Sequence, residues 1–283
     1  MYDEIIRIGD SKIHIGEAND RVYLMKLGPI EYPEIISTIE KMAREKNLGK
    51  IFAKVGEWAS REFLENGYEE EANIPDFFKG TVPAVFFAKY LKPERREIPP
   101  NEKKVMDNIL KICSTKTKAH PLPVPEEYDI RPLEPKNTPA MAELFKNVFP
   151  TYPFPIHEPD YLVEAMDSDV AFYGVFSNGV LLAASSAEMD PDSKNAEMTD
   201  FATLPEARGR KLAGYLLQRM EEDTRENYNI ITAYTIARAL SAGMNITFAN
   251  AGYTYTGTLK NNTNISGKIE SMNVWFKNLI VEL

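Results

Sequence analysis

A short basic cluster, Arg208-Gly209-Arg210-Lys211, stands between a segment suited to a β-strand, residues 196–203, and a strong helix pattern at 212–227. The first N–H groups of a helix have no acceptor within the helix, and the helix dipole places partial positive charge at the same end. Gly209 allows the backbone to approach a ligand closely, and the basic side chains add positive charge. The cluster therefore predicts a phosphate site where the helix begins, against the alternative of an ordinary connection with a solvated basic face.

The stretch around this cluster, MTDFATLPEARGRKLAGY at 198–215, resembles motif A of the GNAT superfamily of N-acetyltransferases. In that pattern an Arg or Gln is followed after two residues by Gly, and after one more residue by Gly or Ala. Arg208 and Ala213 fit the two ends, while Lys211 stands where the middle Gly is expected. Gly209 and Gly214 keep the loop small.

This resemblance implies that acetyl-CoA is the co-substrate. Backbone groups of one strand would then hold the pantetheine and the acetyl carbonyl, and would stabilise the oxyanion that develops on the thioester oxygen; the residues are Phe201, Ala202 and Thr203. The pyrophosphate would be held by the turn and the helix start, at Arg208, Gly209, Arg210, Lys211, Leu212, Ala213 and Gly214.

A narrower resemblance covers most of residues 129–283. The blocks MTDFATLPEARG, TAYTIARALSAGMNITFANAGY, NNTN and ESMNVW look like the beta-lysine N-acetyltransferase family. It implies transfer of acetyl from acetyl-CoA to the ε-amine of L-β-lysine, giving the compatible solute N(ε)-acetyl-β-lysine. Two alternatives stay open: a related enzyme acting on another small amine such as a polyamine, or an acyl-CoA-binding domain without catalysis.

Direct acyl transfer requires a neutral amine. A lysine-like ε-amine has a pKa of about 10.4, so its deprotonation at pH 7 costs about 4–5 kcal/mol. A carboxylate beside the amine would orient the cation and accept its proton, directly or through water. The resemblance makes Glu197 the expected base and Asp200 the second candidate; otherwise either is a solvated or capping carboxylate. Side chains alternate along the strand, so Glu197 shares one face with Thr199, Phe201 and Thr203. The side chains on the opposite face are those of Met198, Asp200 and Ala202.

The residue that protonates the leaving thiolate is not evident. Family members often use a Tyr four residues before the Gly that ends helix 239–251, and Phe248 occupies that position. Ser241 replaces an Asn usually found earlier on this helix. Tyr253 or water would have to act in place of the usual Tyr, and both features favour the non-catalytic alternative.

Two segments are candidates for the amine pocket. The stretch FPTYPFPIHEPDYL at 149–162, with Tyr152 and Phe154, is either a buried connector or a pocket wall. An Asn-rich segment near the C-terminus is typical of a turn. The family resemblance instead suggests that its amides grip the substrate carboxylate while Glu270 binds an ammonium; the amides belong to Asn261, Asn262 and Asn264.

The composition narrows the classes of partner. The net charge of −9 disfavours general binding to nucleic acids or anionic membranes, and fits a cationic small substrate. Cys113 is the single cysteine, so no intramolecular disulfide or cysteine-based zinc site is expected, and the widely spaced His14, His120 and His157 indicate no metal site. One cysteine, an acidic start without a signal peptide and no long apolar run suggest a cytoplasmic protein. The oligomeric state stays open, with a homodimer among the options.

The predicted fold class is α/β with a mixed sheet, in two domains. Residues 1–115 form a smaller α/β domain, 116–128 a proline-rich linker, and 129–283 a domain whose element order resembles the GNAT fold. FLENGY at 63–68 echoes FANAGY at 248–253, so the first domain is a candidate degenerate half-copy of the second. It lacks the basic turn, and would be structural or would cover the active site.

Overall fold

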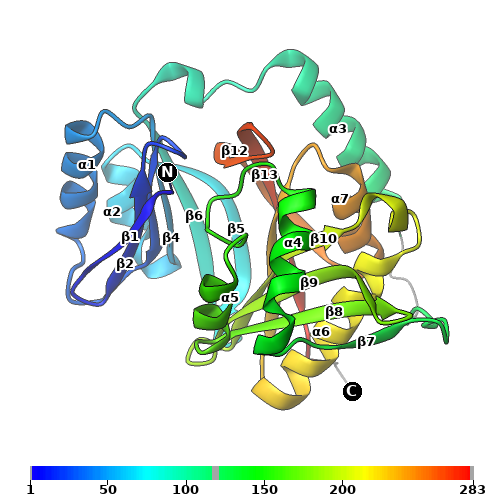
Figure 1. Ribbon diagram of the computed structural model, residues 1–283. Helices are drawn as coiled ribbons and strands as arrows, with labels where there is room; N and C mark the ends of the chain where they lie inside the picture. The colour runs from blue at the N-terminus through cyan, green and yellow to red at the C-terminus, as the bar shows by residue number, and fades with distance from the viewer. Residues whose placement is uncertain (1, 117–120, 281–283) are drawn as a thin grey trace.

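The computed structural model describes residues 2–116 and 121–280, and it confirms the mixed α/β class with two mixed sheets (Figure 1). Residues 117–120 of the expected linker lie outside the described residues, and the domain boundaries stay a prediction. The first sheet has the strand order β1-β2-β3-β4-β6-β5. Its strands are β1 (Glu4–Ile8), β2 (Ser11–Gly16), β3 (Arg21–Lys26), β4 (Lys50–Gly56), β5 (Glu69–Phe78) and β6 (Val82–Tyr90).

The second sheet has the strand order β12-β13-β11-β10-β9-β8-β7. Its strands are β7 (Asp129–Pro132), β8 (Val170–Ser177), β9 (Val180–Asp190), β10 (Asn195–Thr203), β11 (Thr232–Arg238), β12 (Thr254–Ile265) and β13 (Lys268–Asn278). Each sheet contains one parallel pair, β3–β4 and β10–β11, and the other neighbours are antiparallel. A parallel pair needs a crossover connection, which a helix supplies in each case.

Helices cover the outer faces of this pair of sheets (Figure 1). α1 (Ile35–Glu45) and α2 (Ser60–Glu65) share an apolar core with the first sheet. α6 (Leu212–Tyr228) and α7 (Ala242–Asn250) pack on one face of the second sheet, and α4 (Thr138–Val148) and α5 (Pro159–Met166) pack on part of its other face. α3 (Pro100–Ser114) leads from the first sheet to the side of α7. The short 3₁₀ turns are η1 (Glu57–Ala59), η2 (Pro93–Arg95), η3 (Pro135–Asn137) and η4 (Pro205–Ala207).

The two sheets repeat one topology. The elements β1, β2, β3, α1, β4, α2, β5 and β6 have the same neighbours as β8, β9, β10, α6, β11, α7, β12 and β13. The echoed motif also repeats in three dimensions: Phe63 and Tyr68 meet edge to face with ring centroids 5.0 Å apart, and Phe248 and Tyr253 do so at 5.1 Å. The repeat therefore spans six strands and is longer than the expected half-copy.

Two polar strands, β5 and β12, are not evident from the sequence pattern. They carry the runs EEEANIPDFF and TYTGTLKNNTNI, and the expectation of a plain Asn-rich turn in the second run is wrong. Both form antiparallel ladders with apolar partners, β6 and β13, and each ladder is interrupted twice by register shifts. Pairing therefore overrides the weak strand propensity of the acidic and Asn-rich residues.

The two halves are joined through these strands. Lys50 and Glu71 form an ion pair at 2.7 Å with side chains that are 0% and 1% exposed. The Lys50 ammonium also donates to the carbonyl of Lys260 on β12, and the Lys260 amide donates to Glu71. An apolar cluster continues the contact between the sheets, with Phe52, Phe77 and Phe86 on one side and Leu259, Met272 and Val274 on the other. The sheets thus face each other and enclose a cavity.

Within the described residues, no helix is long and apolar enough to cross a membrane. No group of three or more His, Cys, Asp or Glu side chains in that part of the chain is placed to hold a metal ion.

Candidate active site

A cavity of about 1110 Å³ lies between the two halves of the molecule. The first half contributes basic and aromatic side chains, among them Lys12, Arg21, Tyr23, Phe52 and Lys54. The second half contributes acidic and polar side chains on one side and the basic turn on another, including Glu188, Glu197, Asp200, Tyr234, Arg208 and Lys211. One continuous space therefore connects the phosphate turn with a group of carboxylates.

The parallel strands β10 and β11 form a fork beside this cavity. They pair only from Asn195 opposite Thr232 to Glu197 opposite Tyr234. Beyond that point β10 continues along β9 to Thr203, and β11 continues along β13 to Arg238. After Glu197, the edges of β10 and β11 that face each other form no ladder. The two strands therefore border a slot, with backbone donors and acceptors on both sides.

The predicted strand residues of the acetyl-CoA site lie along this slot. Phe201 and Thr203 line the cavity, whereas the side chain of Ala202 is 1% exposed and packs in the core on the α4 side. This placement agrees with side-chain alternation at these three positions, and it leaves the backbone of 201–203 as the part of the strand that would contact a cofactor.

The basic turn leads from η4 into α6 as the sequence predicts. Lys211, the residue before the helix, adopts a left-handed backbone with φ of 61°, and Gly209 has φ of 80°. Lys211 thus takes the conformation that a glycine at this position would adopt without steric cost. The N–H groups of Leu212 and Ala213 stand at the helix start, where no intrahelical acceptor exists. No side-chain cap at the helix start takes the place of that acceptor.

Five of the seven predicted phosphate residues line the cavity: Arg208, Gly209, Lys211, Leu212 and Ala213. Arg210 does not; its guanidinium donates to the carbonyl of Glu206 at 3.3 Å. Gly214 does not either, and a side chain there would meet Leu122 at 3.0 Å. The free amides, the left-handed turn and the two cavity-facing cations fit a pyrophosphate group.

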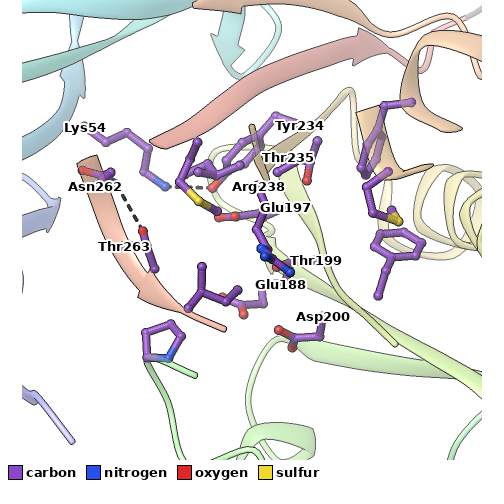
Figure 2. A pocket seen from close by; sticks show the side chains of 18 of the residues that line it. Lys54, Glu188, Glu197, Thr199, Asp200, Tyr234, Thr235, Arg238, Asn262 and Thr263 are labelled. Atoms are coloured by element: carbon purple, nitrogen blue, oxygen red, sulfur yellow. Dashed lines mark hydrogen bonds between the residues drawn. The ribbon is translucent and has the colours of Figure 1, made fainter. Parts of the chain in front are cut away.

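Three carboxyl groups meet at the base of the fork (Figure 2). Glu197 on β10 lies directly opposite Glu188 on β9 in the antiparallel register. Asp200 joins them because the β9–β10 register shifts between Thr199 and Ala202, and Asp200 itself has a left-handed backbone with φ of 55°. The expectation that Asp200 lies on the face away from Glu197 is therefore wrong, since a β-bulge re-aims its side chain.

Each carboxylate has its own hydrogen-bond partners. Asp200 accepts from the Ser186 hydroxyl at 2.6 Å and from the Tyr152 hydroxyl. Glu197 is hydrogen-bonded to the Tyr234 hydroxyl and to the backbone N–H of Ile236. The Lys54 ammonium in turn donates to the Tyr234 oxygen at 2.8 Å, so a chain of hydrogen bonds links the first half of the molecule to Glu197.

Burial disfavours the charged form of all three carboxyl groups. It raises the pKa of Glu197 against the opposing effects of Lys54 and the hydrogen bonds. Burial together with the Asp200 and Glu197 carboxylates raises the pKa of Glu188 to about 8. Burial also raises the pKa of Asp200, opposed by the Ser186 and Tyr152 hydroxyls. Carboxylates with raised pKa values accept protons near neutral pH, which suits general-base chemistry on an ammonium.

Three of the six predicted substrate residues line the cavity: Tyr152, Phe154 and Asn262. The aromatic segment therefore forms part of the wall, and direct contact with a substrate stays a prediction. Asn262 is 1% exposed, and its side-chain oxygen has no hydrogen-bond partner among the described residues.

Asn261 and Asn264 are not placed to contact a substrate, which corrects their assignment. The Asn261 side chain donates to three backbone carbonyls in residues 94–97. The Asn264 side chain donates to the carbonyl of Ala18 at 2.7 Å. Both amides are used to fasten β12 to the first half of the molecule, because the segment is a strand at the junction rather than an open turn.

Glu270 also does not line the cavity, so its assignment to a substrate ammonium is corrected. Its carboxylate is 2% exposed and accepts from Arg238 at both nitrogens, Nε at 3.0 Å and Nη2 at 2.8 Å. Arg238 does line the cavity. Glu270 therefore orients a cavity arginine and is not itself available to a ligand.

At the leaving-group end, the residues of α7 that line the cavity include no tyrosine. Phe248 lines the cavity and meets Phe201 edge to face at 5.6 Å. Tyr253 lies outside the cavity lining, and burial with the nearby Glu221 carboxylate raises its pKa well above the ordinary value. This position does not favour Tyr253 as the proton donor to the thiolate, while Ser241 does line the cavity and water stays a candidate.

Several cavity residues were not predicted. Glu188 is one of them, and its position had a usable signal in the sequence. Residues 190–195 form a tight connection in which Asp190 lies opposite Asn195, and this register puts Glu188 opposite Glu197. The others have no local signal: those on the first half reach the cavity only through the packing of the two halves, and those on β11 only through strand pairing within the second sheet. They are Lys12, Arg21, Lys54, Tyr234 and Arg238.

Comparisons with known proteins agree with this geometry. The model of the acetyltransferase (GNAT) family matches residues 138–242. The chain is 38% identical to a beta-lysine N(6)-acetyltransferase from Methanococcus maripaludis over 97% of this chain and 98% of that protein. It is 31% identical to a beta-lysine N(6)-acetyltransferase from Methanosarcina mazei over 88% and 98%.

Among solved structures, a dodecameric spermidine N-acetyltransferase from Vibrio cholerae overlays with a TM-score of 0.48 at 18% identity, covering 55% of this chain and 95% of that chain. The relatives of similar length and the matching family model show that this chain belongs to the GNAT family, in the group of the beta-lysine N(6)-acetyltransferases, and that it is an acetyl-CoA-dependent N-acetyltransferase.

Proposed function

We propose that this enzyme transfers the acetyl group of acetyl-CoA to the ε-amine of L-β-lysine. The observation that carries the proposal is the meeting of three carboxyl groups and a phosphate-binding turn in one cavity, on a chain whose full-length relatives are named for this substrate. The carboxyl groups suit a cationic amine, and the turn suits a nucleotide-linked acyl donor.

The acyl donor would be held by groups of the second half alone. The turn formed by Arg208, Gly209 and Lys211, with the first amides of α6, would bind the pyrophosphate. The slot between β10 and β11 would receive the pantetheine along residues 201–203. Acetyl-CoA supplies an activated thioester, and backbone N–H groups in the slot would stabilise negative charge on its oxygen.

The amine would lie among Glu188, Glu197 and Asp200. Glu197 accepts the proton of the ammonium directly or through water, with Asp200 as the second candidate base. The hydrogen bond from Tyr234, itself bonded by Lys54, would stabilise Glu197 in its charged form. The neutral nitrogen forms a bond to the acetyl carbon and the carbon–sulfur bond breaks. The nitrogen then loses its second proton as the amide forms, and water passes a proton to the leaving thiolate because Phe248 has none to give.

Release of thiol from acetyl-CoA tests the substrate. Purified enzyme is assayed with L-β-lysine, L-lysine, spermidine and no amine in parallel. Turnover with L-β-lysine at a kcat/KM well above that for the others is the expected result, and mass spectrometry of the product locates the acetyl group on the ε-nitrogen. Higher turnover with spermidine would contradict the assignment, and acetyl-CoA binding without any turnover would contradict catalysis.

The proposed product suits a role as a compatible solute in the cytoplasm. L-β-lysine carries two ammonium groups and one carboxylate, so acetylation of one amine converts a cation into a molecule of zero net charge at neutral pH. A neutral zwitterion can accumulate without a counterion. Expression in a host supplied with L-β-lysine should therefore yield intracellular N(ε)-acetyl-β-lysine that increases with external salt, which NMR of cell extracts measures.

A further inference from the structure

We propose that Arg21 and Asn262 form a subsite for the carboxylate and the neighbouring ammonium of an amino-acid substrate. The inference rests on the proposed function, because it assigns the head group of the same amine substrate. It gives the first half of the molecule a direct part in choosing the substrate.

Arg21 is a buried cation without an anionic partner. It lines the cavity from β3 and is 4% exposed. Its Nη1 donates to the carbonyl of Asn262 at 2.5 Å and to the hydroxyl of Thr263 at 3.1 Å, while Nε has no hydrogen-bond partner among the described residues. No Asp or Glu of the described part of the chain lies within 4.0 Å of its guanidinium nitrogens. Burial lowers the pKa of Arg21 to about 10, and the opposing influence of Tyr23, Asp3 and Glu197 offsets only part of this effect.

A second buried arginine shows how this environment differs from that of a structural arginine. Arg95 is also 4% exposed and also donates to β12, at the carbonyl of Asn261. Arg95 forms an ion pair with Asp20 at 2.8 Å and does not line the cavity. Both arginines fasten the same segment, and only Arg21 faces the cavity without a carboxylate.

Asn262 supplies the complementary acceptor. Asn262 lines the cavity, and its side-chain oxygen is buried and has no hydrogen-bond partner among the described residues. Its side-chain nitrogen lies 3.4 Å from the Thr263 hydroxyl, the same oxygen that Arg21 reaches. The free donor and the free acceptor are therefore neighbours around Thr263.

This pair matches the head group of a β-amino acid. The carboxylate and the β-amine of L-β-lysine are separated by a single methylene between their carbons, so adjacent sites are needed for both. A guanidinium binds a carboxylate through paired N–H groups, and an amide oxygen accepts from an ammonium. In Figure 2, Asn262 and Thr263 lie on β12, whereas Glu188, Glu197 and Asp200 lie on β9 and β10. A polyamine has no carboxylate to offer this subsite.

The test compares L-β-lysine with pentane-1,4-diamine, which is the same molecule with a methyl group in place of the carboxymethyl group. The measured quantity is the ratio of kcat/KM for the two substrates, in wild type, Arg21→Gln, and the matched control Arg95→Gln. Loss of a buried charge-assisted contact should lower the ratio about 100-fold in Arg21→Gln, mainly through KM for L-β-lysine. Arg95→Gln should leave the ratio within about threefold of wild type.

Asn262→Asp keeps the proposal testable even where Arg21→Gln does not fold. The new carboxylate would neutralise Arg21, so the variant should unfold at the wild-type temperature or above it while its ratio falls at least about tenfold. An unchanged ratio in Asn262→Asp, or an equal fall for both substrates in Arg21→Gln, would overturn the subsite. A wild-type enzyme that turns over both compounds equally well would also overturn the subsite, whereas a wild-type enzyme that binds acetyl-CoA but does not acetylate L-β-lysine would overturn the proposed function.

Discussion

The connections β3–α1 and β10–α6 occupy the same place in the two repeats of this molecule, yet only the second has the features expected of an anion site. In the second repeat the turn carries Arg208 and Lys211, and the N–H groups of Leu212 and Ala213 have no acceptor among the described residues. In the first repeat the corresponding turn carries Glu31 and Glu34, and the first amides of α1 are already bonded: Ile35 N–H to the Glu31 carbonyl at 2.8 Å, and Ile36 N–H to the Pro33 carbonyl at 3.1 Å. The two connections therefore share a topology but not these features, because the loop sequence determines whether the first N–H groups of the helix are already hydrogen-bonded.

The two repeats also differ in the charge that they present to the cavity. The first contributes the cations Lys12, Arg21 and Lys54, whereas the second contributes three carboxyl groups, Glu188, Glu197 and Asp200, in addition to the basic turn and Arg238. The packing motif around Phe63 and Phe248 is kept in both, since it stabilises each half independently of function. The first repeat has no counterpart of the basic turn, and it contributes cations to the wall of the cavity.

The strongest test of this division concerns the acidic wall. Glu197→Gln should lower kcat by about 10²–10⁴-fold, because the base is lost while acetyl-CoA binding is kept. Steady-state kinetics with calorimetric titration of CoA separates the two effects. Asp200→Asn is the matched comparison, and a larger loss in that variant would transfer the role of base to Asp200.

The junction between the repeats should depend on its buried ion pair. Glu71→Ala leaves Lys50 buried without its partner and should cost about 3–5 kcal/mol of unfolding free energy. Urea denaturation measures the change. Glu70→Ala, on the same strand but exposed, should change stability by less than about 0.5 kcal/mol. Equal effects in the two variants would show that the junction does not rest on this pair.

Charge reversal in the basic turn should weaken acetyl-CoA binding specifically. Arg208 faces the cavity, so the variant Arg208→Glu should raise the Kd of CoA about 10-fold or more, because its negative charge repels the phosphates. Arg210 lies outside the cavity lining, so the variant Arg210→Glu should raise the Kd of CoA less than about threefold. Similar losses at the two positions would indicate a diffuse field rather than a built site.

The raised pKa of Glu188 predicts a pH dependence of stability. Its pKa is 4.5 ordinarily and about 8 in the folded protein, so between these values the folded state holds a proton that the unfolded state has lost. Stability contributed by this group is therefore lost as pH rises from 4.5 to 8. Glu188→Gln should reduce that loss by at least about 1 kcal/mol, seen as a smaller shift in denaturation midpoint between pH 5 and pH 8. Parallel pH profiles for the two proteins would contradict the raised pKa.

The smallest expected effect concerns the departure from the family pattern at Lys211. Lys211→Gly removes a non-glycine residue from a left-handed conformation and should stabilise the fold by about 1 kcal/mol at most. It also removes a cation from the cavity, so KM for acetyl-CoA should rise slightly. A large fall in unfolding temperature would show that the lysine stabilises the turn in another way.

The local sequence determined the features that depend on a few consecutive residues. The basic cluster before a helix pattern located the turn at 208–213, and the pattern around Glu197 placed a carboxylate beside it. The echo of FLENGY and FANAGY revealed the repeat, because a glycine with positive φ after a helix has a recognisable sequence. These signals were sufficient because backbone conformation, capping and charge act over short distances along the chain.

Only the tertiary structure decided which side chains share the cavity. A bulge, invisible to simple alternation, turned Asp200 toward Glu197, and strand pairing committed Asn261 and Asn264 to the junction. Arg21 and Asn262 are separated by 241 positions, yet they share a hydrogen bond because the sheets pack face to face. Contacts of that kind are set by the burial of two apolar surfaces against each other, and no pattern within either segment specifies its partner.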